Sequence, residues 1–291
     1  MEKIQNNIIK KKILGVISND AGGAELISSW LMKKKNYCNF SLSGPAKKIF
    51  KKKISIKKNL SINNTIKNSE IIITGTSVKS KREFNAIFKA KKKGILTMSF
   101  LDHWVNYKER FVRNKKFILP DYLIVTDEES KKLAARIFNK KQTKLIKIIN
   151  PYLENIKKNF YKKKITIIKN NFIYFSSNLD STNSRISDKE YLEKTISYLK
   201  KKNSLKRIKI TVRRHPSESK KKFIHLKIPN VEISFDENIE LIDTLKEHKT
   251  CFGFESMALV AASICGKYTY SFKSIKKKEN VIPKKYISKY I

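Results

Sequence analysis

The chain has 291 residues, 40% of them hydrophobic, and 65 Lys and Arg against 25 Asp and Glu give it a formal net charge of +40. This length and composition predict a globular protein of two domains, and no apolar run approaches the roughly 20 residues needed to cross a bilayer. The N-terminal segment lacks a signal-peptide pattern, and three widely spaced cysteines indicate neither a disulfide framework nor a zinc site, as expected for a cytoplasmic protein.

Apolar, strand-like segments alternate with segments of helical periodicity through the first half of the chain. In chain order we predict a strand over residues 13–18, a helix over 24–34, a strand over 40–43, a helix through residue 50, a strand over 71–74, a helix over 79–92, strands over 95–101 and 122–126, a helix over 128–138 and a strand over 145–149. Thr126 and Asp127 are predicted to cap the helix that follows them.

The second half repeats this alternation. Here we predict strands over 172–175, 208–212, 231–235, 251–252 and 268–272, with helices over 188–200, 238–247 and 257–265. Continuous apolar strands separated by helices indicate parallel sheets covered on both faces. The predicted fold class is therefore α/β, with two Rossmann-like doubly wound domains, residues 1–155 and 156–291, facing each other across a cleft.

The basic residues are spread over the whole chain. Lysines fall in short runs between or at the ends of predicted elements, without the interleaved aromatic residues on which bases stack. We interpret them as solvated surface and expect no specific nucleic-acid partner, although a basic protein that binds nucleic acid or an anionic membrane without catalysis is kept as an alternative. Arginine is rarer, and four of the eight arginines fall in two polar motifs: Arg110, Arg113, Arg213 and Arg214.

Parallel sheets bind ligands at the carboxyl ends of their strands, so the residues after each strand are the candidates. After the first strand, Gly22 and Gly23 allow a tight turn and close approach of a ligand, and the following helix offers free N–H groups to an anion. Asp20 is a candidate general base, and Glu25 is predicted to line the same cleft. Alternatively, Asp20 caps the helix and the glycines only form the turn. The pattern is not the G-x-G-x-x-G of a simple NAD site.

A second motif follows the strand over residues 95–101. Asp102 places a carboxylate beside the imidazole of His103, and a carboxylate there can orient the ring or change its pKa. Arg110 can hold an anionic group. Asp102 and His103 are therefore candidate catalytic residues, and Arg110 is predicted to line the cleft. The alternative is a surface loop with Trp104 and Tyr107 buried in the core.

A third motif consists of Arg213, Arg214, His215 and Pro216. A strand delivers two arginines and a histidine, and the proline restricts the exit of the chain. Arginine binds phosphate oxygens bidentately and histidine can donate a hydrogen bond or proton, so we predict a phosphate site. The alternative is that Pro216 opens a helix beside a structural histidine.

A fourth motif ends a short strand at Gly253 and opens a helix with Glu255 and Ser256. The Ser256 hydroxyl and the N–H groups of the helix can receive phosphate, and Glu255 can accept ribose hydroxyls. The alternative is an N-cap on a buried helix. Ser176 and Ser177, which also follow a strand, are predicted to line the cleft.

From about residue 171 onward the chain resembles the donor-binding domain of GT-B-type glycosyltransferases. It is nearest to bacterial capsule and lipopolysaccharide sialyltransferases, polysialyltransferases and CDP-alcohol polymerases. The resemblance is carried by His215-Pro216 and by Glu255-Ser256, some 40 residues later. It implies that phosphate of the donor lies on this second pair and that an acidic residue of the first domain, Asp20 or Asp102, acts as base.

Together these patterns predict a metal-independent glycosyltransferase that moves a sugar from a nucleotide-activated donor to a surface-polysaccharide or glycolipid acceptor. No Asp-x-Asp diad suited to a metal-bound nucleotide is apparent, and no cofactor is expected besides the nucleotide sugar as substrate. A sugar-nucleotide 2-epimerase of the same fold and a catalytically silent relative are the other interpretations. The predicted location is the cytoplasm, with peripheral contact at the inner face of an anionic membrane left open.

Overall fold

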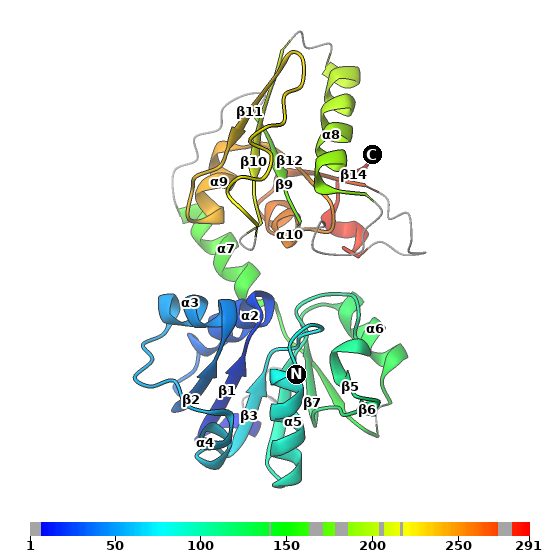
Figure 1. Ribbon diagram of the computed structural model, residues 1–291. Helices are drawn as coiled ribbons and strands as arrows, with labels where there is room; N and C mark the ends of the chain where they lie inside the picture. The colour runs from blue at the N-terminus through cyan, green and yellow to red at the C-terminus, as the bar shows by residue number, and fades with distance from the viewer. Residues whose placement is uncertain are drawn as a thin grey trace. The chain divides into compact units, whose positions relative to one another are not determined.

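The computed structural model describes residues 7–139, 141–162, 171–177, 186–203, 207–215, 218–272 and 281–291. The chain divides into two compact units, Met1–Glu154 (unit 1) and Asn155–Ile291 (unit 2). Each unit contains a six-stranded, all-parallel sheet, and α-helices follow β1, β2, β3, β7, β9, β11 and β12 along the chain (Figure 1). The predicted class of two Rossmann-like α/β domains is confirmed.

In unit 1 the sheet has the order β2-β1-β3-β4-β7-β8. Its strands are β1 (Leu14–Ser18), β2 (Cys38–Leu42), β3 (Ile71–Thr74), β4 (Leu96–Phe100), β7 (Tyr122–Val125) and β8 (Lys144–Lys147). Its helices are α2 (Ala21–Leu31), α3 (Gly44–Lys53), α4 (Ile62–Lys67), α5 (Arg82–Lys92) and α6 (Glu128–Ile137). The strand order reverses at β1, so the topological switch point lies between the carboxyl ends of β1 and β3.

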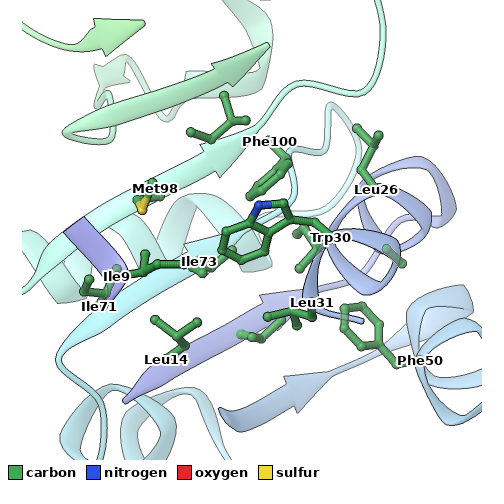
Figure 2. Packing of buried hydrophobic residues seen from close by; sticks show 14 of the residues in the cluster. Ile9, Leu14, Leu26, Trp30, Leu31, Phe50, Ile71, Ile73, Met98 and Phe100 are labelled. Carbon is green, nitrogen blue, oxygen red and sulfur yellow. The ribbon is translucent and has the colours of Figure 1, made fainter. Parts of the chain in front are cut away.

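Unit 1 buries hydrophobic residues on both faces of its sheet: one cluster joins α2 and α3 to the sheet, and two others join α4, α5 and α6 to it. All five residues of β1 and all four of β3 are buried, as their nearly continuous apolar sequences require. Trp30 of α2 packs on Phe100 of β4 with ring centroids 5.4 Å apart, and Figure 2 shows it over Ile73 and Leu31. This packing fixes α2, and therefore the turn before it, against the carboxyl edge of the sheet.

In unit 2 the sheet has the order β11-β10-β9-β12-β13-β14. Its strands are β9 (Phe172–Phe175), β10 (Ile208–Arg213), β11 (Val231–Phe235), β12 (Thr250–Gly253), β13 (Tyr268–Ser271) and β14 (Lys289–Tyr290). Its helices are α8 (Asp188–Asn203), α9 (Leu241–Glu247) and α10 (Met257–Ile264), and α7 (Pro151–Lys162) includes the division between the units. Here the switch point lies between β9 and β12.

Several elements differ from the sequence-based expectation. The helix expected from residue 79 begins at Arg82, because Arg113 binds the carbonyl oxygens of Ser77, Val78 and Ser80 and holds that segment as a loop. The helix expected from residue 24 begins at Ala21, so the two glycines lie in its first turn. The helix expected from residue 238 begins at Leu241.

Several short elements of the described residues were not predicted. Among them are α4, the hairpin of β5 (Val112–Arg113) with β6 (Lys116–Phe117), and β14. The hairpin turns at Asn114 and Lys115, which both have positive φ. Two-residue strands have no periodicity of their own, and β14 depends on pairing with β13. No helix in the described ranges is long and apolar enough to cross a membrane.

The start of α6 confirms the predicted cap. Asp127 Oδ1 accepts the N–H of Ser130 at 2.7 Å, and Ser130 Oγ accepts the N–H of Asp127 at 3.1 Å. Trp104 Nε1 also donates to the Asp127 carboxylate at 3.1 Å. We expect Asp127→Ala to lower the free energy of unfolding by about 1–2 kcal/mol, measured by urea denaturation. The exposed Glu128→Ala is the control, with a change within about 0.5 kcal/mol; equal effects of the two variants would contradict the capping role.

Candidate functional site

The turn between β1 and α2 lies at the switch point of unit 1 and packs closely on two neighbouring loops. A Cβ atom on Gly22 would lie 1.9 Å from Asp102 Oδ2, and one on Gly23 would lie 2.9 Å from the Cα of Gly75. Neither position accepts a side chain without rearrangement. The glycines therefore bring the start of α2 directly against the loops that follow β3 and β4.

Asp20 occupies the N-cap position of α2, but its side chain makes no capping hydrogen bond. Its Oδ1 instead accepts the side-chain amide of Asn19 at 2.7 Å. The carboxylate is only partly buried, so it is available at the carboxyl edge of the sheet. Glu25, one turn into α2, pairs with Lys53 of α3 and takes no part in this cluster.

Asp102 and Arg110 form an ion pair with Oδ1 and Nη1 2.7 Å apart, and their side chains are only 14% and 9% exposed. Arg110 also donates to the hydroxyl and carbonyl oxygens of Thr76, at 2.9 and 3.1 Å. The Arg110 guanidinium, which was predicted to line a cleft, therefore binds Asp102 and Thr76 of unit 1. It orients Asp102 and ties the loop after β3 to the loop after β4.

His103 lies beside this pair. Its Nδ1 accepts the backbone N–H of Trp104 at 3.1 Å, so the neutral imidazole carries its hydrogen on Nε2. Trp104 and Tyr107 are buried, as the structural alternative for this motif proposed. The motif therefore combines two buried aromatic side chains, Trp104 and Tyr107, with two polar residues at the strand end, Asp102 and His103.

Glu83 belongs to this cluster but was missed by sequence reasoning. Its side chain on α5 is 2% exposed, Oε1 accepts the N–H of Asn19 at 2.7 Å, and Oε2 is a buried atom without a hydrogen-bond partner. Burial raises its pKa to about 7, the nearby charge of Asp20 adds to the rise, and backbone N–H groups, including that of Asn19, oppose it. A glutamate in the first turn of a helix is normally solvated, so the sequence carried no signal for this role.

In unit 2, a buried carboxylate joins the loops after β9 and β10. Glu218 accepts the hydroxyl of Ser176 at 2.7 Å, the backbone N–H of His215 at 2.8 Å and Lys222 Nζ at 2.5 Å. Its side chain is 1% exposed. The predicted site residue Ser176 therefore serves to hold the His215 loop.

A second buried carboxylate extends the network to α8. Asp188 accepts the backbone N–H of Ser177 at 3.0 Å and Lys222 Nζ at 2.8 Å. The hydroxyl of Ser177 donates to the carbonyl oxygen of Phe254, in the loop after β12. Three loops at the carboxyl edge, after β9, β10 and β12, are thus joined by hydrogen bonds through Ser176 and Ser177. Asp188, Glu218 and Lys222 were not predicted.

The two arginines at the end of β10 have different environments. Arg213 binds Asp236, the hydroxyl of Thr244 at 2.7 Å and the carbonyl oxygen of Asn238 at 2.8 Å, and so braces the segment between β11 and α9. Arg214 stacks its guanidinium 3.9 Å from the ring centroid of Phe235. Arg214 Nε also donates to the carbonyl oxygen of Lys222 at 3.3 Å, so Arg214 contacts the segment that carries Lys222, whereas Arg213 contacts the segment between β11 and α9. His215 is exposed.

The loop after β12 is constrained by close packing and by an unusual backbone conformation. A Cβ on Gly253 would lie 2.9 Å from the carbonyl oxygen of Phe175, so only glycine fits. Glu255 has φ of 53°, a left-handed conformation that non-glycine residues rarely adopt and that clusters at functional sites. Ser256 is the N-cap of α10, with its Oγ accepting the N–H of Ala258 at 3.3 Å. Pro216 lies outside the described residues.

These features define a chain of two Rossmann-like α/β units that each carry polar residues at the switch point of a parallel sheet. No protein-family model matches the sequence, and no curated protein matches it. Comparison with solved structures supports the same fold.

The UDP-GlcNAc 2-epimerase of Methanocaldococcus jannaschii, in complex with UDP-GlcNAc and UDP, is similar with a TM-score of 0.62 and 13% identity, over 89% of this chain and 83% of that one. That of Neisseria meningitidis, bound to UDP-GlcNAc, has a TM-score of 0.60 and 11% identity, over 94% and 85%. The glycotransferase of kitacinnamycin has a TM-score of 0.52 and 9% identity, over 91% and 81%.

Proposed function

We propose that this chain is an enzyme that acts on a nucleotide sugar, and that its reaction is metal-independent transfer of the sugar to a hydroxyl group of a glycan or glycolipid. The observation that carries the proposal is the edge of unit 2 where the loops after β9, β10 and β12 are joined by hydrogen bonds. This edge contains the start of α10, and it is where doubly wound sheets bind their ligands.

Unit 2 would hold the donor. The first turn of α10 offers backbone N–H groups and the positive end of the helix dipole to a phosphate, and Gly253 lets the end of β12 pack closely on Phe175 of β9 just before this turn. The Ser256 hydroxyl adds a hydrogen bond. Arg214 and His215 supply positive charge and a donor to the leaving phosphate, which takes the electrostatic place of a metal ion.

Unit 1 would supply the base. Asp102 is held in an ion pair by Arg110, whereas the partly buried Asp20 carboxylate accepts a hydrogen bond from the neutral Asn19 amide, so we assign the role of base to Asp20. The acceptor oxygen forms a bond to the anomeric carbon, the bond from that carbon to the phosphate oxygen breaks, and the leaving nucleotide keeps the electron pair. The proton of the acceptor hydroxyl passes to Asp20.

A 2-epimerase is the second candidate, because solved structures of similar fold include enzymes with that name. An epimerase removes and returns a proton on the sugar ring and needs no acceptor. Incubation of the full chain with UDP-GlcNAc in D2O separates the two reactions. Deuterium at the sugar C2, found by mass spectrometry in recovered nucleotide sugar, favours the epimerase, and its absence together with transfer to an added glycan favours the transferase.

We expect one nucleotide among CMP, CDP, UDP and GDP to raise the melting temperature of the chain. At a nucleotide concentration 100-fold above its Kd, binding should stabilise the folded state by about 2.7 kcal/mol. In Ser256→Ala this stabilisation is expected to disappear, because the phosphate loses the hydroxyl at the helix start. The matched control is Ser263→Ala, near the other end of α10, which should keep the shift. A flat response to all nucleotides by the unmodified chain contradicts the proposed function.

A further inference from the structure

Glu83 is a buried carboxyl group that the proposed reaction does not use. It lies in the first turn of α5, is 2% exposed and has one oxygen, Oε2, without a hydrogen-bond partner. Its other oxygen accepts the N–H of Asn19 at 2.7 Å, and Asn19 in turn donates its side-chain amide to Asp20. Asn19 therefore links Glu83 to the Asp20 carboxylate, through its backbone N–H on one side and its side-chain amide on the other.

Few charged groups surround Glu83. The strands against which α5 packs, β1, β3 and β4, contain no titratable side chain, and α4 contributes only the exposed Lys67. Within α5, the neighbouring Arg82 is directed to Ser41, with Nη2 and Oγ 2.6 Å apart. The charge that acts on Glu83 is that of Asp20, on the β1–α2 turn. No basic side chain that the structure describes forms an ion pair with Glu83.

We propose that Glu83 is a positioning residue, whose gain or loss of a proton sets the geometry of Asn19 and Asp20 at the switch point of unit 1. The part of this inference that concerns catalysis rests on the proposed function, in which Asp20 acts as base. The part that concerns the turn is independent of the proposed function.

The physical reason is the strength of the hydrogen bond to Asn19. An ionised carboxylate accepts a backbone N–H in a charge-assisted bond, which is shorter and about twice as strong as a bond to a neutral carboxyl group. With a pKa raised by burial to about 7, Glu83 changes between these forms near neutral pH. The turn that carries Asp20 is thus held tightly above pH 7 and more loosely below it.

The direct test follows the backbone amide of Asn19 by 15N–1H NMR on the full chain, from pH 5.5 to 8.5. We expect its chemical shift to titrate with a midpoint near pH 7, and to be flat in Glu83→Gln, which keeps the shape of the side chain without the charge. Glu128→Gln, an exposed first-turn glutamate on α6, is the control and should leave the Asn19 titration unchanged. A flat Asn19 amide in the unmodified chain, or a titration that survives in Glu83→Gln, overturns the proposal.

A second variant keeps the test decisive if Glu83→Gln does not fold. Asp20→Asn removes the charge that raises the pKa of Glu83, so the midpoint of the Asn19 titration should move to lower pH. An unchanged midpoint in Asp20→Asn overturns the proposed coupling between the two side chains.

Kinetics separate this inference from the proposed function. With nucleotide-sugar substrate, kcat should fall about tenfold between pH 8 and pH 6 at constant KM, and this limb should be absent in Glu83→Gln. A pH dependence that appears only as a change in KM, with kcat constant, overturns the positioning role. If the chain has no activity on any nucleotide sugar while the Asn19 amide titrates as expected, the proposed function fails and the role of Glu83 in the turn is supported.

Discussion

Replacement of Arg110 by alanine is expected to lower the free energy of unfolding by about 3–5 kcal/mol, because it leaves the Asp102 carboxylate buried without its partner. Asp102 is 14% exposed and its Oδ2 lies against Gly22, so little water can replace the guanidinium. The substitution also removes the two hydrogen bonds to Thr76 that join the loops after β3 and β4.

Urea denaturation of a double-mutant cycle measures this effect. The double variant Arg110→Ala/Asp102→Ala should be less destabilised than the sum of the two single variants, because removal of both partners leaves no isolated buried charge. Arg136→Ala, at an exposed position of α6, is the control and should change stability by no more than about 0.5 kcal/mol. A cost below about 1 kcal/mol for Arg110→Ala would show that Asp102 is solvated.

The second large effect concerns the dependence of stability on pH. Because the pKa of Glu83 is raised to about 7 from an ordinary value of 4.5, the folded chain binds a proton more tightly than the unfolded chain between these values. Stability from this group is therefore fully present below about pH 4.5, falls as the pH rises, and is lost above about pH 7. The loss amounts to roughly 3 kcal/mol, at 1.36 kcal/mol for each pH unit of the shift.

Glu83→Gln isolates this contribution, since glutamine does not titrate. We expect the free energy of unfolding of the unmodified chain, minus that of Glu83→Gln, to fall by roughly 3 kcal/mol between pH 4.5 and pH 8. Urea denaturation at intervals of half a pH unit measures the difference, and its slope is informative even if glutamine leaves a buried N–H group without a partner. A difference that is constant, or that rises with pH, would falsify the raised pKa of this carboxyl group.

The sequence predicted most of the fold, because repeating patterns of apolar residues depend on local chain geometry. The strands over Ile71–Thr74 and Phe172–Phe175 were predicted at their observed bounds, and the cap at Asp127 was predicted from its residue type. The short edge strand β14 could not be predicted, since its two residues are extended only through pairing with β13.

The candidate site was predicted only as a set of loops. Residues after strands β1, β4, β10 and β12 were singled out correctly as lying at carboxyl ends, but the partners of each side chain depend on loops far apart in the sequence. Arg110 binds Asp102 and Thr76, and Arg213 binds Asp236. Both guanidinium groups therefore have partners within the chain, which the residue type alone did not indicate when they were predicted to face a ligand. The roles of the predicted site residues in binding and catalysis stay predictions.

What the sequence by itself determined is the alternation of strands and helices, and with it the parallel sheets and the loops at their carboxyl edges. Only the tertiary structure decided which polar groups are buried there. Glu83 is 64 residues from Asn19, whose N–H it accepts, and Glu218 is 42 residues from Ser176. The physical reason is that burial and pairing arise when distant segments pack together, whereas periodicity records only the face that each segment turns toward the core.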